Sequence, residues 1–160
     1  MSTHAPRHGP HEFPEGARVA VVASHWNGPI VERLLEGCTR RLQELRGQAQ
    51  VFRVPGAFEL PTAASWLAAE GGYAAIICLG CVIRGETPHF EYVAGECARG
   101  VMRVSLDSGL PVIFGVLTVE TEQQAIARTG EGHGHAGVAA ADAAAEMAAL
   151  RLALRGTSAS

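Results

Sequence analysis

The segment of residues 80–89, Gly-Cys-Val-Ile-Arg-Gly-Glu-Thr-Pro-His, carries the most distinctive chemistry of the sequence. Thr87 is a favourable helix N-cap and Pro88 a favourable first helical residue, so a helix is predicted to begin there. The free backbone amides expected at this helix start, which is a type of site that binds phosphate, are those of Gly85, Glu86 and Thr87. His89 would lie beside the bound anion, where histidine suits proton transfer at neutral pH. The alternative is a histidine that only fills the helix start.

Three further side chains could take part in binding. Trp26 follows the first predicted strand, where it could stack on a heterocycle or merely cover the edge of the sheet. Glu59 could accept hydrogen bonds from hydroxyl groups, or it could be a solvated carboxylate at a helix start. Arg128 precedes a glycine-containing loop, and it could bind a phosphate or the carbonyl groups of its own helix.

Composition argues against several other chemistries. All 13 basic residues are arginine, so a Walker A loop and a lysine Schiff base are both excluded. No Gly-x-Gly-x-x-Gly follows a predicted strand, which leaves dinucleotide binding unsupported. Cys78 and Cys81 have the spacing of a thiol-exchange motif, but Cys78 falls inside a predicted buried strand. His133 and His135 are too few ligands for a metal site, so no metal and no cofactor are expected.

Length and charge narrow the class of protein. The 160 residues, 48% of them apolar, fit one domain with a substantial core. A net charge of −3 gives no basic field for nucleic acid. The longest uncharged stretches fall well short of the about 20 residues that span a membrane. The N-terminus lacks an apolar signal core, and four cysteines are too few for a disulfide scaffold, so a cytoplasmic protein with reduced thiols is expected.

Hydrophobic patterning predicts an α/β fold. Short apolar runs rich in β-branched residues alternate with segments of helical periodicity, which indicates a four-stranded parallel sheet flanked by helices on both faces. In such sheets ligands bind beyond the carboxyl ends of the strands. The predicted strands are residues 18–24, 50–54, 74–79 and 110–117, and the predicted helices are 28–47, 59–70, 88–108, 123–128 and 138–154. Residues 1–17 are predicted to form a flexible or extended arm, 18–155 the domain, and 156–160 a disordered tail.

Three motifs, in order along the chain, resemble the 6,7-dimethyl-8-ribityllumazine synthase family. They are Pro55-Gly-Ala-Phe-Glu-Leu-Pro61, the segment 80–89, and Val112-Ile-Phe-Gly115, within a match that runs from about Arg18 to Leu154. The resemblance implies a flavodoxin-like three-layer sandwich. It also implies condensation of 5-amino-6-(D-ribitylamino)uracil with 3,4-dihydroxy-2-butanone 4-phosphate in riboflavin biosynthesis, with release of phosphate and water and without a cofactor.

The resemblance also implies a role for each site residue. Trp26 would stack on the pyrimidine, and His89 would transfer the proton. Phe114 would come from a neighbouring subunit, and Arg128 would pair with the phosphate across a subunit boundary. The ring and ribityl chain would contact Ala57, Phe58 and Glu59 and the backbone of Cys81, Val82 and Ile83, and the phosphate turn would be Gly85, Glu86 and Thr87.

Two departures from the family pattern affect these expectations. The usual Arg-Phe-Asn appears as His25-Trp26-Asn27, which enlarges the aromatic side chain. The usual Asn-Lys-Gly appears as His135-Ala136-Gly137, so a cation near the phosphate is missing, and His133 or His135 could replace it.

The family forms pentamers, some assembled into icosahedral shells, so a homo-oligomer is expected, with riboflavin synthase as a further candidate partner. The last predicted helix is rich in alanine, which reflects either high helix propensity or burial against another subunit. Two other functions stay open: a shell that binds flavin-type ligands without turnover, and a flavodoxin-like flavin carrier.

Overall fold

A computed structural model of the protein describes residues 11–130 and 134–157. Its centre is a sheet of four parallel strands in the order β2-β1-β3-β4. The strands are β1 (Arg18–Ser24), β2 (Gln48–Val54), β3 (Ala75–Ile83) and β4 (Val112–Val119). The parallel sheet predicted from the sequence is therefore confirmed.

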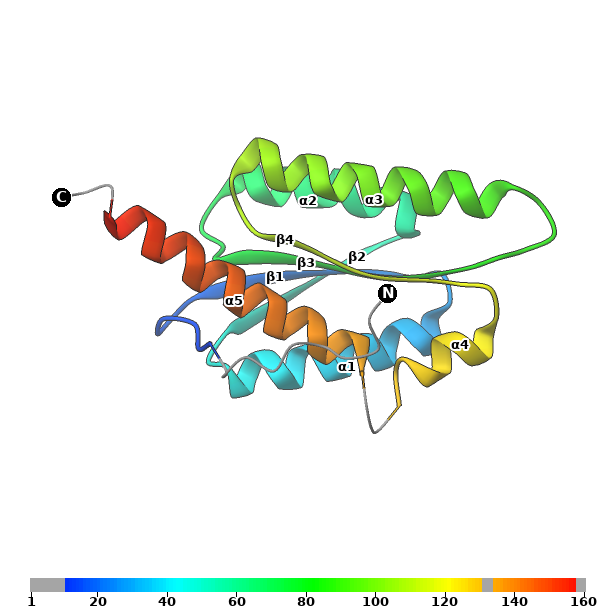
Figure 1. Ribbon diagram of the computed structural model, residues 1–160, viewed down its shortest axis with the longest axis horizontal. Coiled ribbons are helices and arrows are strands. Elements are labelled where there is room, and N and C mark those ends of the chain that lie inside the picture. Colours follow the sequence, from blue (N-terminus) through cyan, green and yellow to red (C-terminus); the bar gives the residue numbers. More distant parts are fainter. Residues whose placement is uncertain (1–10, 131–133, 158–160) are drawn as a thin grey trace.

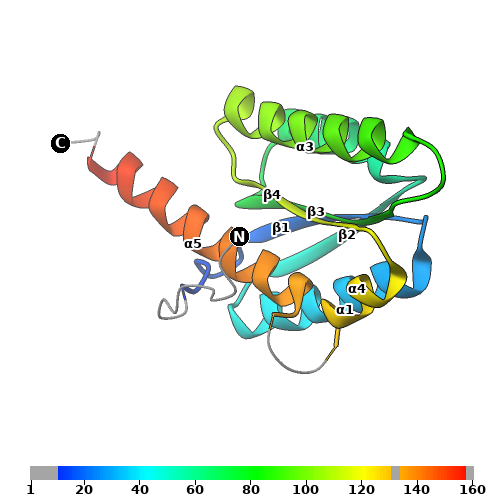
Figure 2. The same cartoon turned by 45° about the vertical axis from the view of Figure 1, so that its right-hand side comes forward.

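Helices cover both faces of the sheet, as Figures 1 and 2 show. One face carries α1 (Gly28–Glu44), α4 (Glu122–Ala127) and α5 (Ala136–Thr157). The other carries the short 3-10 helix η1 (Ala57–Glu59), α2 (Leu60–Glu70) and α3 (His89–Ser108). The carboxyl ends of the strands lie at the right of Figure 1, where each chain segment leaves the sheet for the next helix. These three layers confirm the predicted flavodoxin-like class.

The middle strands explain the continuous apolar runs of the sequence. In β1, Val19 and Val21 point into the core beneath α1 and α5, whereas Ala20 and Val22 point into the core beneath α2 and α3. All four side chains are fully buried. Because successive residues of a strand face opposite sides, a strand covered on both faces needs apolar residues throughout.

Two boundaries differ from the predictions in ways that affect the site. Strand β3 continues to Ile83 instead of ending at Leu79, because Cys81, Val82 and Ile83 pair in register with the end of β4. Helix α3 begins at His89, and Pro88 rather than Thr87 occupies the N-cap position. The residues expected to follow the third strand are thus its last residues, and the loop before α3 is short.

The structure describes part of the chain before β1 and the whole of α5 after the sheet. Phe13 is buried, and its N–H donates a 2.8 Å hydrogen bond to the carbonyl oxygen of Leu45. Helix α5 extends to Thr157, and its last turns project past the rest of the molecule (Figures 1 and 2). Residues 1–10 of the predicted arm and 158–160 of the predicted tail lie outside the described residues. Among the described helices, none is long and apolar enough to cross a membrane.

The four cysteines are free thiols buried within the domain. Cys78 is fully buried in β3, and desolvation there raises the pKa of its thiol. Burial also raises the pKa of Cys81 to about 11, with the nearby Glu122 as a second cause. Thiol exchange needs an exposed cysteine with a lowered pKa, so the structure confirms that Cys78 is an apolar strand residue.

Candidate active site

A cavity of about 690 Å³ opens at the carboxyl ends of β1 and β3, against the start of α3. The chain runs from β1 to β2 on one side and returns to β3 on the other, so this is the switch point of the sheet, where ligands of such folds bind. The cavity contains most of the predicted site. Its walls are Trp26, Asn27, Gly56, Ala57, Phe58, Glu59, Cys81, Val82, Ile83, His89, Tyr92 and Val93.

Asn27 joins the two strands at the cavity floor. Its side-chain Nδ2 donates a 2.8 Å hydrogen bond to the carbonyl oxygen of Cys81. Its backbone is left-handed, with φ 56°, a conformation that asparagine tolerates better than most residues. Asn27 therefore holds Trp26 at a set place relative to β3. Asn27 is not among the predicted site residues, although an asparagine just before Gly28-Pro29 is a recognisable helix-start signal.

The wall formed by η1 offers both an apolar surface and a carboxylate. Glu59 Oε2 accepts a 2.9 Å hydrogen bond from the N–H of Gly56, which orients the side chain. A Cβ atom on Gly56 would lie 3.3 Å from Trp26 Cδ1, so the glycine leaves room for the indole. Among the described residues no hydrogen bond occupies Glu59 Oε1, and that oxygen can accept from a ligand hydroxyl.

Large aromatic side chains stand open around the cavity. Trp26 is 74% exposed, Phe58 56% and Tyr92 69%. Exposed aromatic groups gathered at one cavity provide flat surfaces for a planar ligand. Tyr92 and Val93 were not predicted, although they follow His89 by three and four residues and so share its face of α3.

His89 occupies the first position of α3 and lines the cavity. Its N–H makes a long contact of 3.5 Å with Thr87 Oγ1. The preceding residues Gly85, Glu86 and Thr87 are exposed and do not line the cavity themselves. His89 thus lines the cavity and directly follows, in the chain, the loop predicted to bind phosphate.

Phe114 and Arg128 lie outside the cavity of the single chain. Phe114 is in β4 and is 41% exposed. Arg128 follows α4, and its Nη1 lies 3.9 Å from where a Cβ atom of Gly134 would be. Among the described residues that line the cavity there is no arginine, so a phosphate bound there would need a cation from elsewhere.

His135 points towards α1 instead of the cavity. Its Nδ1 accepts hydrogen bonds from the N–H of Gly137 at 3.1 Å and of Val138 at 3.4 Å, so the ring caps the start of α5. A Cβ on Gly37 would lie 2.7 Å from His135 Nε2, which shows how closely the ring packs on α1. Burial and the nearby Arg40 lower the pKa of His135.

A neutral, packed capping ring does not support His135 as the replacement cation, and His133 lies outside the described residues. In the described part of the chain, no group of three histidine, cysteine or acidic side chains could hold a metal ion.

Because His135 caps α5, the stability of the protein is predicted to depend on pH. Since the pKa of His135 is lower in the folded than in the unfolded chain, protonation favours unfolding. Its stabilising contribution is complete above the unfolded value of about 6.5 and is lost as the pH falls below it. The melting temperature should therefore drop more for the unsubstituted protein than for His135→Asn, which caps without titrating, when thermal scans are repeated between about pH 7.5 and about pH 5.5. Equal drops in the two proteins would contradict this role.

The doubly wound sheet and its cavity at the switch point define an α/β protein of the flavodoxin-like class, with a cavity where such folds bind small molecules. The sequence profile of the 6,7-dimethyl-8-ribityllumazine synthase family matches residues 16–151. Two proteins named 6,7-dimethyl-8-ribityllumazine synthase, from Stenotrophomonas maltophilia strains R551-3 and K279a, are each 50% identical to this chain over 140 residues, which cover 86% of the chain and 90% of each relative. The chain belongs to the 6,7-dimethyl-8-ribityllumazine synthase family.

Proposed function

We propose that the chain condenses 5-amino-6-(D-ribitylamino)uracil with 3,4-dihydroxy-2-butanone 4-phosphate in riboflavin biosynthesis. The products are 6,7-dimethyl-8-ribityllumazine, phosphate and water. The observation that carries the proposal is that Trp26, with its open indole, and His89, at the start of α3, line the same cavity. Family membership supports the same reaction.

The pyrimidine substrate fits the half of the cavity between β1, η1 and β3. Trp26 supplies a flat surface for the ring, and Phe58 and Ala57 extend the apolar wall. Glu59 Oε1 accepts from hydroxyl groups of the ribityl chain, since Oε2 is held by Gly56. The backbone of Cys81, Val82 and Ile83 faces the ring from the end of β3.

The phosphate substrate fits the other half, beside the loop before α3. The amides of Gly85, Glu86 and Thr87 bind the phosphate, and Arg128 of a neighbouring copy supplies the cation that the single-chain cavity lacks. Phe114 of the neighbouring copy covers the ring. Both residues are exposed in the single chain, which is compatible with such a shared site.

Catalysis rests chiefly on alignment of the two substrates. The amine of one and the ketone of the other form an imine between themselves, a step that requires no lysine of the protein. Effective molarities of about 10⁵ M or more arise when reacting groups are held in line. His89 moves protons during phosphate loss and ring closure, because it stands between the two substrate positions.

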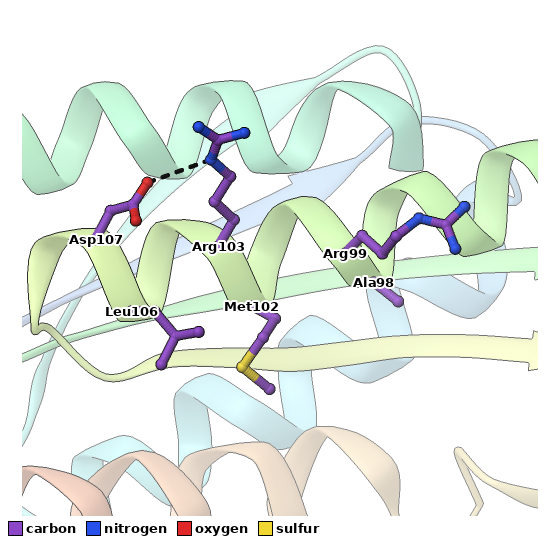
Figure 3. Close-up of a pocket in the computed structure, with 6 residues that line it drawn as sticks. All are labelled: Ala98, Arg99, Met102, Arg103, Leu106 and Asp107. Carbon is purple, nitrogen blue, oxygen red and sulfur yellow. Dashed lines mark hydrogen bonds and ion pairs between the residues drawn. The ribbon is translucent and has the colours of Figure 1, made fainter.

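This site is complete only in a homo-oligomer. The proposed assembly is a pentamer, and an icosahedral shell is the larger alternative. Exposed apolar side chains support it: Met102 and Leu106 project from one side of α3 (Figure 3), and Met147 and Leu150 are exposed on α5. Arg103 and Asp107, which line the same hollow of the surface as Met102 and Leu106, are paired with each other. Contiguous exposed apolar groups of this kind mark contact surfaces. The proposal also includes riboflavin synthase as a partner. It includes a cytoplasmic location, which the four free thiols support.

One assay separates the proposed function from its alternatives. Purified protein mixed with both substrates should produce the lumazine at a rate proportional to protein concentration, followed by absorbance. A protein that binds the lumazine or riboflavin but forms no product would instead be a ligand-binding shell. Binding of a flavin with reversible reduction, and again no product, would indicate a flavin carrier.

Arg128→Ala should selectively weaken binding of the phosphate substrate. Loss of one charge-assisted contact should raise KM for the butanone phosphate about tenfold, while KM for the pyrimidine stays within about twofold. Arg128→Lys should recover part of the loss, because it keeps a charge but not the planar pair of donors. Steady-state kinetics with each substrate varied in turn provide the measurement, and an unchanged KM for the phosphate substrate would remove Arg128 from the site.

A further inference from the structure

The loop between β3 and α3 has no core of its own. Every residue from Arg84 to His89 is exposed, so hydrophobic packing does not determine where its backbone amides point. Within the loop itself, the described hydrogen bonds are the long contact of Thr87 with the N–H of His89 and the helix-start bond from Glu91 N–H to the carbonyl of Pro88. A loop that must bind a small anion needs a stronger constraint than these.

Arg84 contacts two parts of the chain at once, the end of β4 and the first turn of α3. Its Nε lies 2.7 Å from Glu120 Oε2, just after β4, and its Nη1 lies 2.9 Å from Glu91 Oε1, in the first turn of α3. Its guanidinium carbon lies 4.4 Å from the centre of the Phe90 ring. Its backbone N–H donates to the carbonyl of Val119 at 2.9 Å, which ties it to the sheet. The side chain thus spans the loop from its first residue to the helix beyond it.

The charge of Arg84 is already engaged. Two carboxylates, Glu91 and Glu120, face one guanidinium, so this cluster carries a net negative charge and does not attract phosphate. Lysine could not replace it, because an ammonium group cannot hold two carboxylates in a plane and stack on an aromatic ring together. Its contacts point to a geometric role.

We propose that Arg84 is a positioning residue that holds the loop before α3 in the arrangement that binds the phosphate of the substrate. The proposal rests on the proposed function for its kinetic consequence. Its structural core, that Arg84 restrains the loop backbone, stands independently of the reaction.

In Glu120→Gln, the direction of the change in phosphate-substrate binding distinguishes the two possible roles of Arg84. If Arg84 or the loop bound phosphate through net charge alone, removing a nearby carboxylate would strengthen binding of the phosphate substrate. If Arg84 acts by position, the same substitution loosens the loop and weakens binding. We expect KM for the butanone phosphate to rise about twofold to threefold, with KM for the pyrimidine unchanged, as befits the loss of one exposed ion pair.

Arg84→Lys should raise KM for the phosphate substrate more than Glu120→Gln does. We expect KM for the phosphate substrate, and the inhibition constant of inorganic phosphate, to rise about fivefold while kcat changes less than about twofold. The matched control is Arg46→Lys, which alters an exposed ion pair with Glu12 at the opposite end of the sheet and should leave both constants unchanged. A decrease of KM in Glu120→Gln, or equal effects of Arg84→Lys on both substrates, would overturn the proposal.

Hydrogen–deuterium exchange of the full chain tests the restraint without any turnover. The amides of Gly85, Glu86, Thr87 and His89 should exchange at least about threefold faster in Arg84→Lys and in Glu120→Gln than in the unsubstituted protein, whereas Arg46→Lys should match it. If the unsubstituted protein formed no lumazine, the proposed function would fail, and this measurement would still decide the role of Arg84. Unchanged exchange in both variants would show that Arg84 does not restrain the loop.

Discussion

His89→Ala should lower kcat about a hundredfold and leave a slow but measurable enzyme. The imidazole lines the cavity at the first position of α3, so its removal takes away proton transfer but neither the aromatic surface of Trp26 nor the carboxylate of Glu59. Substrate alignment therefore continues to accelerate the reaction. The KM for each substrate should change less than about threefold, because the main binding contacts come from other residues. Single-turnover and steady-state measurements of lumazine formation provide both constants.

His11→Ala is the control for this substitution, since His11 is an exposed residue before β1. It should leave kcat unchanged. Complete loss of turnover in His89→Ala would mean that alignment contributes little, and an unchanged kcat would show that another group transfers the proton. Either result would require a different assignment for His89.

Gly137→Ala should produce the largest loss of stability among single substitutions at glycine. A Cβ at this position would lie directly against the carbonyl oxygen of Leu34 and 2.9 Å from its carbonyl carbon, so α5 must move away from α1. Backbone cannot rotate aside as a side chain can, and overpacking of this kind costs about 3 kcal/mol. Alanine recovers about 1 kcal/mol through its higher helix propensity, which leaves a net loss of about 2 kcal/mol. Denaturant titration at fixed protein concentration measures the difference.

Gly156→Ala is the matched control within the same helix. Apart from its neighbours in the helix, no atom of the described residues lies within 4 Å of the Cβ that it would add, so helix propensity dominates and stability should stay equal or rise by at most about 1 kcal/mol. If both variants unfolded at the same denaturant concentration, the close approach of α5 to α1 would not contribute to folding.

Much of the fold could be predicted because it depends on local pattern. The apolar run from Val19 to Ala23 requires burial on both faces, and the spacing of Ile30, Leu34 and Cys38 requires an amphipathic helix; each is confirmed. The motifs around Phe58 and His89 indicate the family through their sequence alone, and the family is confirmed. The roles of the individual site residues stay predictions.

Contacts between distant segments could not be predicted in this way. The sequence alone does not show that Asn27 hydrogen-bonds Cys81, that Gly137 meets Leu34, or that β3 continues to Ile83 because β4 extends beside it. Each depends on the relative placement of two elements, which results from packing of the whole domain.

By itself, the sequence determined the elements, the two-faced sheet and the family, because these follow from periodicity and short contiguous motifs. Tertiary structure alone decided that the carboxyl ends of β1 and β3 and the start of α3 meet around one cavity. It also decided that His135 caps α5, and that Arg84 spans the loop to Glu91 and Glu120. Side-chain direction and ion pairing depend on neighbours far apart in the chain, and only the packed fold brings those neighbours together.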